Sequence, residues 1–521
     1  MIRNSQISRR QAMAGLAKAT ASMSVTSLGS RIAAATPSAL EDQLAWTPAW
    51  RLQQLLQNRE ISPVELVRSA LDRIARLDPI IHAYLTVDHD GALEEAELAE
   101  RALLNGDEVG PLHGIPISIK DLYATSGVRT TQGSRIFAEN VPDVDEILVE
   151  RLRNAGAIII GKTQTPEFAT FPRTKNLLAE ECVNPWDTSR ISGASSGGAA
   201  AAVAMGMTSW AIASDGGGST RIPAALNGVF GFQPSAGRVP MRTPVSVHMA
   251  SAGPITQDVR DGAIMMQIIS GWDARDPSTI DAPAPDLLSG LDAGIVGLRI
   301  GWSADWGVIP AVDNRVLELA GQATSLLASA GASVDEASIV LPDAQAWPVF
   351  IGMNEYSYRR TGHLLGFDEE QRALLTPPVM GMLGQIEGAG GTLFSPADYT
   401  RLFELRRGLV QWIEGVFSSF DLICTPTVGQ IAPLVPDGEW DQPYTDTYSI
   451  DHISTNYTYI ANVLGLPAAS VPCGFVDGLP VGLQIIGPRL ADERVFRAAK
   501  TFSELMPWAD RHPVLAESAQ A

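Results

Sequence analysis

The stretch Ser192-Gly193-Ala194-Ser195-Ser196-Gly197-Gly198 leads directly into an alanine-rich run at 199–205, and this junction is the most informative part of the 521-residue chain. Serine and glycine in this proportion are typical of a flexible linker. A linker would not lead straight into a run as apolar as Ala-Ala-Ala-Ala-Val-Ala-Met, which predicts a buried helix. The stretch therefore predicts a fixed, serine-bearing loop at the start of a buried helix.

Strand and helix signals alternate on both sides of this loop. Short runs typical of strands occur at 115–119, 157–160, 422–425, 468–472 and 482–486. Residues 40–80 are predicted to be helical, with a capped start at Ser62-Pro63-Val64-Glu65. Strands that alternate with helices predict an α/β fold, here an α/β/α sandwich around a large mixed sheet.

We expect one domain over residues 40–515. Residues 275–420 have a less regular pattern, with acidic and proline-rich loops, and strand signals return after them. This order favours a single domain with a variable, substrate-shaping region at about 275–420 over two independent domains.

Residues 1–35 differ from the rest of the chain because they hold five basic residues and no acidic residue. Ser8-Arg9-Arg10 precedes an alanine- and serine-rich stretch and then Ala33-Ala34-Ala35. This order resembles a twin-arginine export signal followed by a cleavage site. We therefore expect export to the periplasm or the outside of the cell; without a working signal the protein would be cytoplasmic.

Composition excludes several classes of partner. The formal net charge is −20, and an acidic surface repels phosphate backbones, so nucleic acid is not an expected partner. No segment reaches ~18 uninterrupted apolar residues, the minimum for a membrane span. The seven histidines lack metal-ligand spacing, and the three cysteines are predicted to be small buried apolar residues, so we expect no metal and no cofactor. A monomer and a homodimer both fit the composition.

Two further segments carry chemistry of the same kind as the serine loop. The first is Pro116-Ile117-Ser118-Ile119-Lys120-Asp121, in which a lysine ends an apolar strand although the chain has only five lysines. The second is Ser214-Asp215-Gly216-Gly217-Gly218-Ser219-Thr220-Arg221-Ile222-Pro223. Taken singly, each is compatible with an ordinary surface charge or turn.

Together the three segments supply what acyl transfer requires. A serine hydroxyl is a weak nucleophile that needs an adjacent base. A lysine can be that base only when it is neutral, and burial lowers its pKa enough to allow this. Glycines before a serine leave backbone N–H groups free to converge on an oxyanion, and each such donor lowers the barrier by about 3–4 kcal/mol. The three-glycine run before Ser219 suits that role.

The set K-D, G-x-S-S-G-G and D-x-G-G-S-x-R-x-P resembles the amidase signature family over roughly residues 45–515. Flanking segments agree, among them Gly231-Phe232-Gln233-Pro234 and Gly465-Leu466-Pro467-Ala468. The resemblance implies hydrolysis of C–N bonds in amides, with carbamates (urethanes) and esters as further candidate substrates. The implied reaction needs no metal.

The resemblance also implies a role for each matched residue. Ser219 would be the nucleophile, Lys120 the base and Ser195 the bridge that relays the proton, with a cis peptide bond at Ser195. The N–H groups of Gly216, Gly217, Gly218 and Ser219 would form the oxyanion hole. Asp215, Arg221 and Ser196 would support the loops. The expected pocket residues are Ala169, Thr170, Phe171, Gly193 and Ala194, with Met353, Tyr356, Met380 and Trp440 as more distant candidates.

Competing interpretations rest on other motifs. Gly156–Thr163 matches the phosphate-binding loop pattern, but Ala-Ile-Ile-Ile within it predicts a buried strand instead. Gly193–Gly197 matches the nucleophile elbow of an α/β-hydrolase esterase, which would make Ser195 the nucleophile with His452 or His512 as base. That elbow requires a preceding strand, whereas residues 184–188 predict a turn. The chain could also be a non-hydrolytic amidotransferase subunit or an inactive binding protein.

Overall fold

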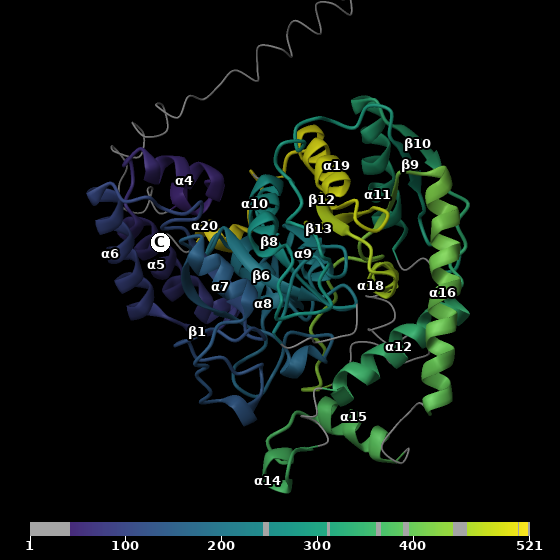
Figure 1. The fold of residues 1–521 in the computed structure, drawn as a ribbon, viewed down its shortest axis with the longest axis horizontal. Coiled ribbons are helices and arrows are strands. Elements are labelled where there is room, and N and C mark those ends of the chain that lie inside the picture. The colour runs from purple at the N-terminus through teal and green to yellow at the C-terminus, as the bar shows by residue number, and fades with distance from the viewer. Residues whose placement is uncertain are drawn as a thin grey trace, which may run out of the picture.

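One twisted mixed sheet runs through the molecule, and the other elements are arranged around it (Figure 1). The computed structural model describes residues 42–242, 249–309, 313–360, 366–388, 395–440, 456–508 and 510–518. Within this part of the chain the sheet has 11 strands in the order β1-β3-β2-β6-β8-β7-β12-β13-β11-β9-β10. In chain order the strands are β1 (Tyr84–Val87), β2 (Pro116–Lys120), β3 (Ile158–Thr163), β6 (Trp210–Asp215), β7 (Phe230–Gln233), β8 (Ser251–Thr256), β9 (Arg299–Trp302), β10 (Ser333–Glu336), β11 (Leu422–Pro426), β12 (Ala468–Val476) and β13 (Leu479–Ile486). A separate two-stranded sheet pairs β4 (Val183–Asn184) with β5 (Asp187–Ile191).

The helices lie on both faces of the sheet, as predicted. The longer ones are α4 (Ala49–Gln57), α5 (Pro63–Ile81), α6 (His89–Asn105), α7 (Ile147–Asn154), α8 (Gly197–Ala204), α9 (Arg221–Asn227), α10 (Val259–Ile269), α11 (Asn314–Leu326), α12 (Asp343–Arg360), α15 (Pro377–Gly388), α16 (Pro396–Ser419), α18 (Tyr459–Leu464) and α19 (Asp492–Leu505). Shorter helices are η1 (Arg135–Phe137), η2 (Glu167–Ala169), η3 (Leu327–Ala330), α14 (Glu369–Arg372) and α20 (Val514–Ser518).

The alternation of side chains along the central strands separates two cores. Ile117 and Ile119 of β2 and Ile212 of β6 pack into one core with residues of α4, α7, α10, α11 and α19. Ala211 and Ala213, which alternate with Ile212, pack on the opposite face with α8 and α9. Because successive side chains of a strand point to opposite faces, both faces of the sheet are covered. The predicted α/β/α architecture is confirmed.

Parallel pairing at the centre of the sheet creates the edge on which the site is built. β2 pairs parallel with both β3 and β6, with Ser118 opposite Ala211 and Ile119 opposite Ile212. The carboxyl ends of parallel strands meet at one edge of a sheet. Lys120 and Asp215, the last residues of β2 and β6, therefore lie at the same edge although 95 positions separate them.

Most predicted elements are present close to their predicted bounds. Ser62 caps α5 through a reciprocal capping box with Glu65, and Pro63 occupies the first turn. The region 275–420 contributes β9, α11 and β10 to the fold around the main sheet and then forms α12, α14, α15 and α16. Figure 1 shows α14 and α15 at the end of the molecule farthest from α19. The division into one domain and a substrate-shaping region stays a prediction.

The cysteines behave as predicted, because Cys182, Cys424 and Cys473 are all buried and free. Burial raises the pKa of each thiol, so none is a reactive thiolate at neutral pH. In the described part of the chain, no helix combines the length and apolar character needed to cross a membrane. The predicted export signal at 1–35 lies outside the described residues and stays a prediction.

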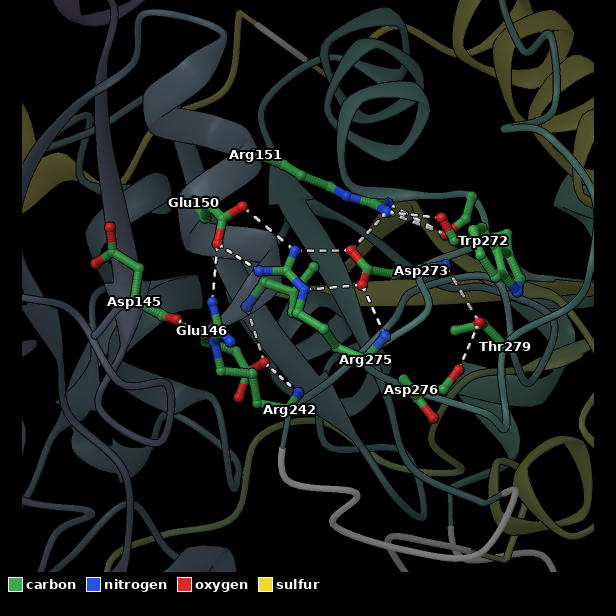
Figure 2. Close-up of polar contacts among 12 residues, drawn as sticks. Asp145, Glu146, Glu150, Arg151, Arg242, Trp272, Asp273, Arg275, Asp276 and Thr279 are labelled. Atoms are coloured by element: carbon green, nitrogen blue, oxygen red, sulfur yellow. Dashed lines mark hydrogen bonds and ion pairs between the residues drawn. The ribbon is translucent and has the colours of Figure 1, made fainter.

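A network of arginines and carboxylates fixes the chain beside α7 (Figure 2). Glu150 accepts hydrogen bonds from Arg242 Nη2 at 2.9 Å and from Arg275 Nη1 at 2.8 Å. Arg275 also donates to Asp273 at 2.7 Å, and Arg151 donates to the backbone carbonyls of residues 269–272. The network ties residue 242 and the end of α10 to α7. Because most of its side chains are partly exposed, it contributes order at the surface more than stability.

Candidate active site

Lys120 is the residue around which the site is arranged. Its side chain is completely buried on the face of the sheet that carries α8. Its Nζ lies 2.7 Å from Oγ of Ser195, 2.8 Å from Oγ of Ser196 and 2.8 Å from Oγ of Ser214. Burial lowers the pKa of Lys120 well below its usual value, and the charge of Asp215 opposes only part of this shift. No carboxylate among the described residues forms an ion pair with Lys120.

Three hydroxyl groups around a buried amine suit the neutral form of lysine. A neutral amine donates two hydrogen bonds and accepts one, and a hydroxyl group can take either part. A buried ammonium would need a counter-charge to offset its desolvation. The surroundings of Lys120 therefore favour an uncharged nitrogen with a lone pair available to a neighbouring hydroxyl.

The serine loop presents Ser195 and Ser196 to this amine from the start of α8. The peptide bond between Ala194 and Ser195 is cis, as the resemblance implied. Ser195 is 2% exposed, and Ser196 is fully buried with its hydroxyl also donating to the carbonyl of Ser214 at 3.2 Å. The hydroxyl of Ser196 is thus also engaged by the backbone, whereas that of Ser195, the slightly exposed residue of the two, contacts Lys120.

Ser219 lies directly beside this loop. Its carbonyl oxygen accepts a hydrogen bond from the N–H of Ser196 at 3.2 Å, which joins the two serine-bearing segments. Ser219 is partly exposed, and within the described residues its hydroxyl has no hydrogen-bond partner. The segments that carry Lys120, Ser195 and Ser219 are therefore brought together as predicted, with an unengaged hydroxyl on Ser219.

Asp215 and Arg221 form a buried ion pair beneath the glycine loop. Arg221 donates to Asp215 through Nε at 3.0 Å and Nη2 at 2.9 Å, and both side chains are fully buried. Burial alone would raise the pKa of Asp215, but the charge and hydrogen bonds of Arg221, with those of Asn462 and Gly218, hold it below its usual value. The pair is in place to support the loop, as predicted.

The remaining donors of Arg221 reach four acceptors in three other segments. Nη1 donates to Gln484 at 2.6 Å and to the carbonyl of Thr458 at 3.0 Å, and Nη2 donates to Gln233 at 2.6 Å and Asn462 at 2.7 Å. Each of the three nitrogens of this guanidinium group therefore donates to at least one acceptor. Arg221 therefore fixes the glycine loop against β7, β13 and α18.

The backbone N–H groups of the glycine loop do not all have the same role. The N–H of Gly218 donates to Oδ1 of Asp215 at 2.7 Å, so it is already engaged. Among the described residues, the N–H groups of Gly216, Gly217 and Ser219 have no acceptor. The structure thus differs from the prediction at Gly218, because the carboxylate that supports the loop takes its proton. Three of the four predicted donors remain available to an oxyanion.

The predicted pocket residues lie in two segments. Gly193 has a positive φ of 79°, and Ala194 forms the cis peptide with Ser195, so both belong to the serine loop. Ala169 and Thr170 are half-buried in or after η2, and the buried ring of Phe171 lies 5.9 Å from the ring of Trp440. Their contact with a substrate stays a prediction.

The more distant pocket candidates differ in burial. Met353 packs in a buried cluster with residues of α12, α16 and α18, whereas Met380 is 40% exposed on α15. The side chain of Tyr356 lies outside the described residues. Phe350 was not predicted, yet its ring covers Gly217 so closely that a Cβ there would lie 2.7 Å from it.

The two competing motifs do not form the sites they resemble. Residues 158–163 are strand β3, buried throughout, so no phosphate-binding loop is present there. Lys162 is also buried, and it donates to Thr125 at 3.0 Å and Thr130 at 2.7 Å. Burial lowers the pKa of Lys162 to about 8. Its partners make it part of the core rather than a phosphate ligand.

The nucleophile-elbow interpretation fails on the partner of Ser195. The predicted turn is present at residues 185–186, where it joins β4 to β5. Strand β5, which was not predicted, then precedes the loop, and it is paired antiparallel with β4. However, β5 belongs to the small two-stranded sheet, and the hydroxyl of Ser195 contacts an amine rather than an imidazole. His512 stacks on Trp46, and His452 lies outside the described residues.

Comparison with known proteins decides the family. A family model described as Amidase matches residues 65–496. A bacterial aryl acylamidase, described as one of the amidase signature enzymes, superposes with a TM-score of 0.80 at 30% identity, covering 91% of this chain and 98% of that one. The chain belongs to the amidase signature family. A second family member, the peptide amidase from Stenotrophomonas maltophilia, also superposes on the present chain. Its TM-score is 0.76 at 29% identity, covering 90% of this chain and 98% of that one.

Curated relatives of this amidase signature protein include a component of an amidotransferase. One subunit of the glutamyl-tRNA(Gln) amidotransferase of Dehalococcoides mccartyi (strain CBDB1) is 34% identical over 486 residues, covering 89% of this chain and 97% of that relative. The family membership supports an amidase-type enzyme. No group of three or more histidine, cysteine or acidic side chains in the described ranges is arranged to hold a metal ion.

The Asp215–Arg221 pair yields a prediction about stability. Replacing Arg221→Met leaves the buried carboxylate of Asp215 without its counter-charge, which should lower the free energy of unfolding by about 3–5 kcal/mol. Urea unfolding followed by circular dichroism measures this. The double variant Asp215→Asn with Arg221→Met should recover part of the loss, because the unpaired charge is gone.

The matched control is Arg260→Met, which removes a partly exposed pair with Asp292 and should change the free energy of unfolding by no more than about 1 kcal/mol. A loss from Arg221→Met as small as that of this control would contradict the assigned role of the buried pair.

Proposed function

We propose that this protein hydrolyses the C–N bond of small-molecule amides through an acyl-enzyme formed on Ser219. One observation carries the proposal: a fully buried lysine amine, with no described carboxylate to pair with, lies 2.7 Å from the hydroxyl of Ser195. Such an amine is neutral enough to accept a proton at working pH. Ser219, beside Ser195 and preceded by three glycines, is the nucleophile that this base serves.

The reaction begins with attack of Ser219 Oγ on the amide carbonyl carbon. As the bond forms, the proton of Ser219 passes to Oγ of Ser195, whose own proton passes to Nζ of Lys120. The negative charge that develops on the carbonyl oxygen is stabilised by the N–H groups of Gly216, Gly217 and Ser219. These donors are available because no described residue accepts from them.

Collapse of the tetrahedral intermediate breaks the C–N bond. The proton held by Lys120 returns through Ser195 to the departing amine, which leaves as a neutral molecule and frees an acyl-enzyme at Ser219. Water then attacks the acyl carbon by the same relay, releasing the carboxylic acid and restoring both hydroxyls. The relay thus acts as base in each attack and as acid in each collapse.

The same tetrahedral chemistry extends to carbamates and esters, which we propose as further substrates. The amide preference is supported by the solved relatives, one described as an aryl acylamidase and one as a peptide amidase. We also propose that the protein acts as a single chain or as a homodimer. Nucleic acid is not a proposed partner, because the net charge of the protein is −20.

The alternative function is that of an amidotransferase component, which curated relatives with 34% identity favour. Such a component would be non-hydrolytic by itself and would act only with partner subunits and RNA. The two functions differ in what the purified chain does by itself: a free-standing amidase turns over an aryl amide without any partner, whereas a dedicated amidotransferase component requires one.

Substitution of the relay is the first test. Ser219→Ala and Lys120→Ala should each lower kcat for a nitroanilide amide by at least about 10³-fold, because the nucleophile or its base is removed. Release of nitroaniline by the purified single chain, followed by absorbance, measures this. Lys500→Ala on α19 is the matched lysine control and should retain the parent rate. Undiminished turnover by the Ser219 variant would remove the mechanism.

The pH dependence follows from the lowered pKa of Lys120. Activity requires the neutral amine, so kcat/KM should rise with pH through the ionisation of Lys120 and level off well below about 10.4, the usual lysine pKa. Stability has the same sign: between the folded and unfolded pKa values the unfolded chain binds more protons, so the fold is stabilised as pH rises. Initial rates from pH 5 to 11 test this. A rise that begins only near the ordinary lysine pKa would be inconsistent with it.

A further inference from the structure

The peptide unit between Gly217 and Gly218 is held at both of its ends. Its carbonyl oxygen, on Gly217, accepts a hydrogen bond from Oγ1 of Thr458 at 2.6 Å. Its N–H, on Gly218, donates to Oδ1 of Asp215 at 2.7 Å. The carbonyl and N–H of one planar trans peptide point in opposite directions, so two bonds at opposite ends fix the orientation of its plane. The bond from Thr458 comes from a residue 241 positions away.

We propose that Thr458 is a positioning residue for the oxyanion hole, an inference that rests on the proposed function above. The fixed unit lies between the two peptide units that carry the N–H groups of Gly217 and Ser219. Those two N–H groups are among the donors proposed to stabilise the oxyanion. Locking the unit between them restricts the torsions that set their directions, so that both point at one place before the substrate arrives.

Thr458 is itself held in place by Arg221, the same residue that supports the glycine loop. Its backbone carbonyl accepts from Nη1 of Arg221 at 3.0 Å, and its side chain is fully buried at the start of α18. The neighbouring carbonyl of Tyr457 accepts from Nε2 of Gln484 at 2.8 Å, and Gln484 in turn accepts from Arg221. The backbone of Thr458 is therefore fixed, and the hydrogen bond from its hydroxyl fixes the position of the Gly217 carbonyl in turn.

The glycine at 218 fits this arrangement and limits what can replace it. Gly218 has a φ of 125°, a conformation that residues with a side chain rarely adopt. A Cβ at this position would collide with Oγ1 and Cβ of Thr458. The close approach of Thr458 and the absence of a side chain at 218 are thus parts of one arrangement, which places the threonine hydroxyl against the loop backbone.

Asp215 alone would leave the unit incompletely fixed. Its carboxylate holds the N–H end only, and it also accepts from Arg221 and Asn462. Without the hydroxyl of Thr458, the carbonyl oxygen of Gly217 would be a buried acceptor without its donor. The peptide plane between Gly217 and Gly218 could then rotate until this oxygen found another donor. Such a rotation would turn the N–H groups on either side away from the oxyanion, where misdirected donors contribute little.

The test compares Thr458→Val and Thr458→Ala, which remove the hydroxyl, with Thr458→Ser, which keeps it. Turnover of a nitroanilide by the purified full chain gives kcat and KM over a range of pH. We expect Val and Ala to lower kcat by about 10–100-fold, the scale of a weakened oxyanion donor, with KM within about threefold of the parent. Serine should restore kcat to within about threefold. The pH at which the rate rises should not move, because the relay through Lys120 is intact.

Two controls separate this from general destabilisation. Thr324→Val removes another fully buried threonine hydroxyl, which donates to the carbonyl of Ala320 at 2.9 Å within α11, and should leave kcat unchanged. Thermal melts establish which Thr458 variants are folded, and the alanine variant, which cannot overpack the site, carries the test where valine does not fold. Ser219→Ala, assayed alongside, reports separately on the proposed function.

Three results would overturn the proposal. The first is a folded valine or alanine variant whose kcat stays within twofold of the parent. The second is a serine variant as slow as alanine, which would assign the effect to the threonine methyl group rather than to its hydroxyl. The third is a shifted pH dependence in the valine or alanine variant, which would mean that Thr458 acts through Lys120. Activity retained by Ser219→Ala would instead contradict the mechanism on which the proposal rests.

Discussion

Burial of a single amine without a counter-charge is the constraint on which this site depends. Lys120 ends the central strand of three parallel strands, where the sheet and α8 remove it from water. Its only close partners among the described residues are hydroxyl groups, which can stabilise a neutral amine by donating or accepting. Burial of the hydrophobic cores on both faces of the sheet thus supplies the free energy that keeps the Lys120 amine desolvated. This desolvation lowers the pKa of Lys120.

The buried pair of Asp215 and Arg221, in contrast to Lys120, is charged. Arg221 and Asp215 keep their charges because each compensates the other, and the guanidinium directs its remaining donors to residues from β7, β13 and α18. One side chain thereby fixes the glycine loop relative to neighbouring β7 and to β13 and α18, whose residues are more than 230 positions away. The site therefore combines a neutral base, which needs freedom to change its protonation state, with a charged support that must not change. Separating these tasks allows the proton relay to work on a backbone that stays still.

The sequence predicted what is local. Lys120 at the end of an apolar strand, the serine loop before an alanine helix and the glycine run before Ser219 all carry their signal within ten residues, and the resemblance supplied the cis peptide. The engagement of Gly218 by Asp215 had no such signal, because it depends on the folded path of the loop. Thr458, Asn462 and Gln484 lie far along the chain and become partners only through strand order. β5 was missed because its segment, Asp-Thr-Ser-Arg-Ile, is mostly polar and partly exposed, although its partner β4 is next to it in the chain. By contrast, α16 could have been found, since Ser395-Pro396 with Asp398 repeats the capped start of α5.

The charge state of Lys120 is the central claim, and nuclear magnetic resonance of the lysine side chains measures it directly. The chain has only five lysines, so protein labelled with ¹³C at the lysine ε-carbon gives few resonances, and Lys120→Arg assigns the one of interest. The account predicts that this resonance titrates well below about 10.4 and already has the shift of a neutral amine in the pH range of maximal activity. A resonance that keeps the shift of an ammonium throughout that range would contradict it.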